Sequence, residues 1–287
     1  MSALTIETTL PATRVQRTAR PIRLGPWLAV GFLGFLIVAA LLPNAFAHSD
    51  PLAIVPQDAF HPPSWAHWFG TDQSGRDIFS RVIYGTRQSL FIGLAATALA
   101  MSIAIVLGLL GGLGGARLDR SVGWLLEVLF AFPSLVLALL FVAVFGSGVG
   151  PLIIATGLGG APGYARMVRG QVLAVRNAGY IEAAVALGHS RRRIILRQLL
   201  PNAMRPLIVT LTMGVGQAIV WASALSFLGL GARPPAPEWG TMLSMGRDFI
   251  ANAWWLTFFP GLFIVLTTLS TTVAGRYLQQ RLEGRLS

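Results

Sequence analysis

The chain alternates long apolar stretches with shorter polar ones. Crossing a bilayer takes roughly 20 residues of α-helix, and six apolar stretches approach or exceed that length. We expect transmembrane helices over residues 27–46, 88–113, 122–146, 149–165, 206–230 and 253–274. A transmembrane β-barrel would instead show short segments of alternating hydrophobicity. The pattern therefore predicts an all-α membrane protein with six transmembrane helices.

The fourth of these stretches is irregular. It contains the segment Thr156–Gly163, which is rich in glycine and includes Pro162, so we expect a break in the helix there. Within hydrocarbon, such backbone survives only where it packs against protein or lines a cavity. Close packing through small residues is one explanation. A bend beside a substrate path is the other.

Composition supports a membrane protein and excludes one enzyme class. Hydrophobic residues make up 54% of the 287 residues and charged residues 11%, whereas a soluble domain carries about 25% charged residues. All 22 basic residues are arginine. A phosphate-binding P-loop needs a lysine that reaches the β- and γ-phosphates, so this chain is not itself an ATPase. Because there is no cysteine, disulfides and thiolate metal sites are also excluded.

The arginines predict the orientation of the spans. If residues 1–26 lie in the cytoplasm, then 17 of the 22 arginines fall in segments on that side and 5 on the other. Positive residues favour the cytoplasmic side, so we expect both termini inside the cell. This distribution also accounts for the net charge of +11 without a nucleic-acid partner.

The same arrangement divides the chain into segments. The expected order is a cytoplasmic segment (1–26), a first transmembrane helix (27–46), an outer loop (47–87), a five-helix core (88–274) and a cytoplasmic tail (275–287). The core includes a cytoplasmic helical loop over residues 166–205.

The N-terminus has a second interpretation. Arginines, an apolar run from Trp27 to Leu42 and the triplet Ala45-Phe46-Ala47 also fit a signal peptide with an A-x-A cleavage site. The run is 16 residues long, slightly more than the roughly 7–15 of a signal-peptide core. We favour a retained first span; cleavage would leave the other five spans in the same orientation.

A polar, arginine-rich segment from Tyr180 to Pro201 interrupts the apolar pattern. Glu182-Ala183-Ala184 is predicted to lie on a short helix, with the small residues Ala184 and Gly188 on one face that another surface can approach closely. Gly188 suits a helix C-terminus in the left-handed conformation. Ser190 can cap a second helix over 191–200, which Pro201 is expected to end.

An amphipathic helix bound to anionic headgroups would account for the arginines that follow Ser190, but not for the spacing before them. That spacing resembles the "EAA" loop of ABC-transporter permeases, in which the membrane subunit contacts a separate ATPase. One departure is Gln198, where the family usually has isoleucine. The resemblance implies ATPase-coupling roles for these residues: Glu182, Ala183, Ala184, Gly188, Leu200 and Pro201.

Several further segments carry recognisable motifs, in the order His67–Arg81, Ala131–Ser134, Ala224–Gly231, Pro234-Pro235, Glu238–Gly240 and Phe259–Leu262. Through these segments, from about residue 65 to 265, the chain resembles the second permease subunit of dipeptide, oligopeptide and nickel importers. The tail departs from that family at Gly275-Arg276 and near its end, so no function is assigned to it.

The resemblance implies the type I permease fold of ABC importers and a set of partners. These are a homologous permease in a pseudo-heterodimer, two ATP-binding subunits in the cytoplasm and a substrate-binding protein outside the membrane. It implies import of short peptides, with nickel or a metallophore as the alternative substrate. No cofactor and no catalytic residue are expected in this chain.

Isolated polar residues suggest other functions less strongly. Glu127 is the one acidic residue inside a predicted span, and we expect it to reach headgroup water, Arg117 or Arg120. The outer histidines His48, His61 and His67 lie near aspartates, but their spacing matches no metal motif. A secondary transporter would need several intramembrane ionisable groups and internal repeats. A membrane enzyme would need a buried polar cluster within the spans.

Overall fold

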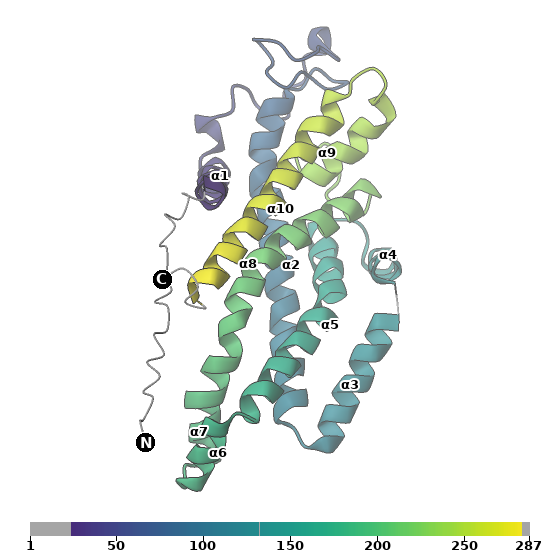
Figure 1. Cartoon of the computed structure of the whole chain (residues 1–287). Coiled ribbons are helices and arrows are strands. Elements are labelled where there is room, and N and C mark those ends of the chain that lie inside the picture. Colours follow the sequence, from purple (N-terminus) through teal and green to yellow (C-terminus); the bar gives the residue numbers. More distant parts are fainter. Residues whose placement is uncertain (1–23, 132, 283–287) are drawn as a thin grey trace, which may run out of the picture.

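The computed structural model describes residues 24–131 and 133–282, and this part of the chain is built almost entirely of helices (Figure 1). The all-α prediction is confirmed. The elements are α1 (Leu24–Leu41), η1 (Pro43–Ala45), η2 (Pro56–Asp58), α2 (Ile78–Leu113), α3 (Ala116–Ala131), α4 (Ser134–Phe145), α5 (Val149–Arg176), α6 (Gly179–Ala186), α7 (Arg191–Ile194), η3 (Ile195–Leu199), α8 (Leu200–Phe227), α9 (Trp239–Gly246), η4 (Arg247–Phe249) and α10 (Trp255–Leu282).

Helices α2, α5 and α8 form the centre of the bundle (Figure 1). Helix α10 packs along α8, α1 packs on α10, and α3 and α4 lie on the opposite side. Glycines let α2 and α5 approach closely: a Cβ on Gly108 would lie 2.5 Å from Cγ1 of Val168, and one on Gly112 would overlap Cγ1 of Val172. Such small-residue contacts are how helices pack where solvent provides no hydrophobic driving force.

Four of the described helical stretches are long and apolar enough to cross a membrane. They are α1, α2, the continuous stretch Arg191–Phe227 and α10. The predicted third span is divided at Pro133 into α3 and α4, and α5 has the length but not the apolarity of the other four. The count of six spans therefore stays a prediction.

Two helix boundaries differ from the sequence-based expectation. Helix α2 begins ten residues before the predicted span, because the Asp77 carboxylate caps it by accepting a hydrogen bond from the Ser80 amide at 2.8 Å. Helix α5 runs through Pro162 without the predicted break and ends at Arg176. Pro162 is buried, and a proline is tolerated within a membrane helix where it packs in protein.

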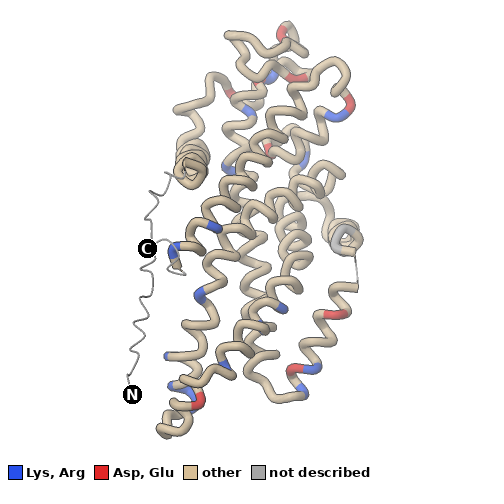
Figure 2. The backbone as a smooth tube through the Cα atoms, viewed as in Figure 1, with Lys and Arg blue, Asp and Glu red and all other residues tan. Residues whose placement is uncertain are grey.

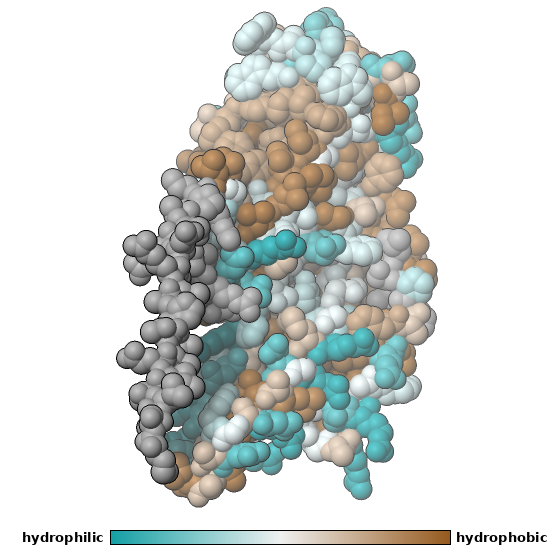
Figure 3. All heavy atoms as spheres, viewed as in Figure 1, coloured by the Kyte–Doolittle hydropathy of each residue, from teal (hydrophilic) through white to brown (hydrophobic). Residues whose placement is uncertain are grey.

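Figure 2 shows many of the arginines in the half of the molecule that carries α6 and α7, and Figure 3 shows a broad hydrophobic surface over its other half. The N-terminal arginines up to Arg23 and the end of the tail lie outside the described residues. At the end opposite α6, residues 42–77 form a loop region over α2, α9 and α10.

Buried polar contacts fix this loop region. Arg81, only 1% exposed, donates to the carbonyl oxygens of Pro51 at 3.1 Å and Pro235 at 3.0 Å. The indole of Trp255 donates to the Thr71 carbonyl at 3.0 Å. These bonds join segments that are far apart in the sequence, so they hold the loop region in a defined position against the helices.

Candidate functional site

The segment that the sequence singled out lies at one end of the molecule, where α5 ends and α6 and α7 follow (Figure 1). Gly188 has φ +76°, the left-handed conformation that the sequence predicted. Its amide donates to the Val185 carbonyl at 2.9 Å, and the His189 amide donates to the Ala184 carbonyl at 3.1 Å. This pair of bonds is a Schellman motif, which satisfies the last carbonyls of α6.

The second predicted cap is also present. The Ser190 hydroxyl accepts a hydrogen bond from the Arg193 amide at 3.4 Å and begins α7. A turn of only a few residues therefore reverses the chain between two helices, as local sequence rules predicted.

The predicted end of the second helix at Pro201 is wrong. One π-type turn, Ile195–Leu199, connects α7 to α8, and the helix continues to Phe227. Within it the Leu200 amide bonds to the Ile195 carbonyl, five residues back. Pro201 follows directly in the first turn of α8, where its missing N–H and its ring are tolerated.

Helix α6 presents two different faces. Ile181 and Ala184 are buried and pack in one core with Ile194 and Leu199. The small side chain of Ala184 therefore serves packing within this chain. On the other face Glu182, Ala183 and Gly188 are exposed, and a Cβ on Gly188 would meet nothing within 4 Å.

Two apolar side chains that the sequence reasoning missed extend this exposed face. Val185 is 61% exposed and Leu187 is 75% exposed. We call Glu182, Ala183, Val185, Leu187 and Gly188 together the α6 face. This face therefore combines two exposed apolar side chains with one acidic side chain.

Arginines connect this region to the bundle. Arg176 donates to the Gly112 carbonyl at 3.2 Å and Arg191 to the Leu113 carbonyl at 3.4 Å, so both bind the C-terminal end of α2, where a helix favours positive charge. Leu200 and Pro201 lie farther along, at the start of α8. The structure thus brings the Glu-Ala-Ala triplet and Gly188 together at α6 and places Leu200-Pro201 apart from them, beyond α7 and η3.

Residues 104–284 match the model of a protein family described as "Binding-protein-dependent transport system inner membrane component". The chain belongs to this family. The permease resemblance inferred from the sequence motifs is therefore confirmed, and the chain is a permease subunit of an ABC transporter.

Individual proteins show the same relationship. The permease is 40% identical over 256 residues to the "Dipeptide transport system permease protein DppC" of Alkalihalophilus pseudofirmus, a match that covers 88% of this chain and 83% of that one. It is 42% identical over 224 residues to the "Glutathione transport system permease protein GsiD" of Pectobacterium atrosepticum, covering 78% and 74%.

Solved structures support the fold. An inward-facing structure of the MetNI methionine ABC transporter contains a chain that superimposes with a TM-score of 0.57 at 22% identity, covering 69% of this permease and 95% of that chain. The expected type I permease fold is confirmed by this likeness.

The structure also shows the position of Glu127, the acidic residue expected inside a span. Glu127 is exposed on α3 and, among the described residues, makes no ion pair with Arg117 or Arg120. The expected contact with these arginines is absent there. Its exposed position leaves headgroup water as the expected partner.

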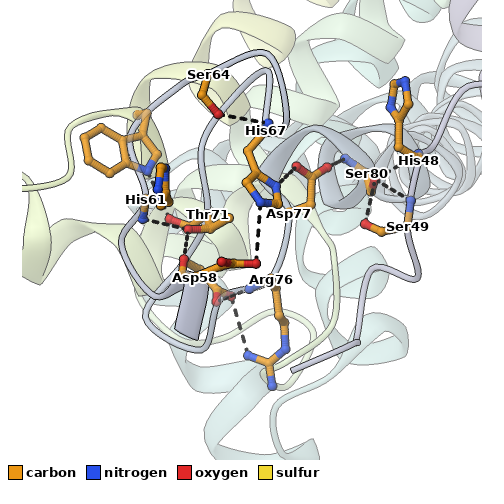
Figure 4. Close-up of polar contacts among 12 residues, drawn as sticks. His48, Ser49, Asp58, His61, Ser64, His67, Thr71, Arg76, Asp77 and Ser80 are labelled. Carbon is orange, nitrogen blue, oxygen red and sulfur yellow. Dashed lines mark hydrogen bonds and ion pairs between the residues drawn. The ribbon is translucent and has the colours of Figure 1, made fainter. Parts of the chain in front are cut away.

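The outer histidines lie in the loop region, where the ring centroids of His61 and His67 are 6.2 Å apart. His67 lies between two carboxylates, with its Nδ1 3.2 Å from Asp77 Oδ1 and its Nε2 3.7 Å from Asp58 Oδ2 (Figure 4). His48 instead packs against the ring of Trp68. Within residues 24–131 and 133–282 no three histidine or acidic side chains are placed to hold a metal ion. His67 is thus a structural link between the loop region and the cap of α2.

Proposed function

We propose that this permease is a subunit of an ATP-driven importer of short peptides, with its α6 face as the contact for the ATPase. The observation that carries the proposal is the construction of that face. A Schellman turn and a buried inner side hold α6 rigidly, while Val185 and Leu187 are presented outward beside Glu182. A protein partner that covers Val185 and Leu187 would remove their apolar surface from water.

The proposed assembly has four kinds of subunit. A homologous permease pairs with this chain to enclose the substrate path, two ATPases bind on the cytoplasmic side, and an external binding protein delivers the peptide. The relatives named for dipeptide and glutathione transport support a peptide substrate. Nickel or a metallophore is the alternative substrate, and no group of metal ligands in the described residues favours it.

The proposed mechanism is mechanical and involves no covalent chemistry in this chain. When ATP closes the two ATPases, each pulls on the α6 face of its permease. Ile181 and Ala184 belong to the same buried core as Ile194 and Leu199, just before α8, and the displacement reaches α8 through this core. Helix α8 also lines the centre of the bundle, so its movement changes which side of the membrane the path opens to.

The proposed orientation places α6 in the cytoplasm and residues 42–77 outside. The 17-to-5 distribution of arginines supports it. Packing of α1 on α10, with Leu36 completely buried, supports a first helix that is retained in the mature protein.

The test is reconstitution of the complete transporter in proteoliposomes with ATP inside and a labelled dipeptide outside. We expect ATP-dependent uptake by the complete assembly and no ATP hydrolysis by the purified permease alone. Uptake of nickel but no peptide, or ATPase activity in the isolated permease, would refute the proposal.

A further inference from the structure

A cavity of about 230 Å³ lies among α2, α4, α5 and α8. Its α2 residues, Ala96 to Ala100, are at the middle of that helix, so the cavity lies near the middle of the bundle. Alanine, glycine and threonine make most of its wall, and the lining contains no acidic residue, arginine or histidine. The glycine-rich segment of α5 that the sequence marked as irregular forms one side of it.

One buried hydroxyl in this wall has no partner. The hydroxyl of Thr97, on α2, donates to the Gly93 carbonyl one turn back in its own helix, at 2.8 Å. Thr156 on α5 is 9% exposed, and its Oγ1 forms no hydrogen bond within the described part of the chain. A buried polar group without a partner is destabilising, and a hydrogen bond from a bound molecule would remove that cost.

The mouth of the cavity is also polar. Gln217 and Trp221 lie one turn apart on α8, line the cavity and are exposed, as is Gly163 on α5. An amide side chain facing lipid at this depth would leave its hydrogen-bonding groups unsatisfied. The mouth therefore faces water, another chain or a ligand.

We propose that this cavity is a substrate-contact site that receives one uncharged side chain of the passing peptide. The proposal assigns the hydrogen bonds with the peptide group beside that side chain to Thr156 Oγ1 and the Gln217 amide, on two residues that line the cavity. The inference rests on the proposed function and adds a specificity-determining site to it. The homologous permease completes the enclosure on the side of the mouth.

The size and charge of the cavity determine which side chains of a peptide it accepts. Sites that enclose a whole drug-sized ligand occupy roughly 300–1,000 Å³, so this cavity suits part of a small peptide. Burying an unpaired charge is strongly unfavourable, and the wall has no group to neutralise one. Neutral side chains are therefore accepted, acidic and basic side chains are disfavoured, and the charged termini are held elsewhere.

The first test narrows the mouth. A Cβ on Gly163 meets nothing within 4 Å, and the same holds for Gly170, two turns farther along α5 and outside the cavity. In the complete reconstituted transporter, Gly163→Leu is expected to lower uptake of labelled Ala-Phe relative to Ala-Ala by about tenfold or more. The control Gly170→Leu should leave this ratio unchanged. Because every variant uses the same binding protein, that protein's own preference cancels.

The second test removes the hydroxyl. Thr156→Val is expected to lower Ala-Phe uptake about three- to tenfold, the size of one lost hydrogen bond, while the permease stays as thermally stable or becomes more so. Thr156→Ser should retain uptake. A purely structural threonine would give the opposite result, with lowered stability and no effect on the transport of correctly folded protein.

Other outcomes would overturn the inference. An unchanged Ala-Phe to Ala-Ala ratio in Gly163→Leu shows that no substrate side chain enters the cavity. If uptake of both peptides falls equally and the second permease no longer co-purifies, the cavity is a contact site for that second permease and not for the substrate. If the wild-type transporter takes up neither peptide, the proposed function fails, and the cavity assignment fails with it.

Discussion

Arg169 on α5 and Asp119 on α3 form a two-pronged ion pair, with Nε to Oδ1 at 2.5 Å and Nη2 to Oδ2 at 2.9 Å. This pair holds the start of α3 against the bundle, close to the arginines that bind the end of α2. Parallel hydrogen bonds of this kind are stronger and more directional than a single charged contact.

Removing one partner should weaken the attachment of α3. Both side chains are about one-third exposed, so we expect Asp119→Asn to lower the free energy of unfolding by at most about 1 kcal/mol. Thermal unfolding in detergent measures the change. The double exchange Asp119→Arg with Arg169→Asp is the control and should recover part of the loss; no recovery would show that the pair itself does not stabilise the fold.

The same pair predicts a pH dependence. The hydrogen bond from Arg169 lowers the pKa of Asp119 below its ordinary value of 3.8. A carboxyl group with a lowered pKa contributes stability above its unfolded-state pKa and loses it as the pH falls through the folded-state pKa. Wild type should therefore lose stability relative to Asp119→Asn only when the pH falls below about 4. An equal difference between the two proteins from pH 7 to pH 3 would contradict this.

Gly188 tests the turn after α6. Its left-handed φ penalises side chains with a Cβ, although there is open space around it. We expect Gly188→Leu to abolish ATP-dependent uptake while the protein remains in the membrane, and Gly188→Asn, which tolerates this conformation, to retain much of it. Gly179→Leu, at an exposed glycine with equally open space and no positive φ, is the control. Normal uptake and ATPase retention in Gly188→Leu would exclude the proposed coupling role.

The exposed apolar residues test the docking surface directly. Leu187→Asp is expected to release the ATPase from the purified assembly, because it places a second negative charge in an apolar contact beside Glu182. The matched control is Leu196→Asp, at a leucine that is 52% exposed on η3 and lies outside the α6 face. Pull-down measures how much ATPase each variant retains. Equal amounts of bound ATPase in the two variants would contradict a docking surface on α6.

The absence of cysteine makes the orientation easy to test by single-cysteine labelling. Ser64→Cys and Ala236→Cys should react with a membrane-impermeant thiol reagent applied outside. Ser190→Cys should react only after the membrane is permeabilised. The reverse pattern would show that the arginine distribution does not report the orientation of this chain.

Features that depend on a few neighbouring residues were predictable from sequence. The left-handed Gly188 and the Ser190 cap follow from local backbone rules, and the structure has both. The start of α2 was missed because hydropathy alone does not register a capped polar turn such as Asp77 to Ser80. The continuity of α5 through Pro162 depends on neighbouring helices that a local rule does not include.

The α6 face and the cavity could not be predicted from the sequence, because both depend on the fold. Ala184 is buried in the core that includes Ile194 and Leu199, whereas Leu187 is exposed, and periodicity over the eight residues of α6 cannot determine which side faces the core. The cavity is assembled from four helices that are distant in sequence. The open volume, the unpartnered hydroxyl of Thr156 and the exposed Gln217 at the mouth distinguish that glycine-rich wall from ordinary close packing, and the sequence shows none of these features.

The unbroken helical stretch from Arg191 to Phe227 has a consequence for how far parts of the permease can move. It spans 37 residues, or roughly 55 Å at 1.5 Å per residue, so a tilt of about 10° around its midpoint would displace each end by about 5 Å. In a stiff rod the same tilt would move Gln217 and Trp221, which lie roughly 12 and 18 Å beyond the midpoint, by roughly 2 and 3 Å in the opposite direction to the base. The π-type turn at Ile195–Leu199 gives the rod a different pitch near its base. If α6 drives the helix as proposed, a bend at this turn would shorten the movement that reaches the far end.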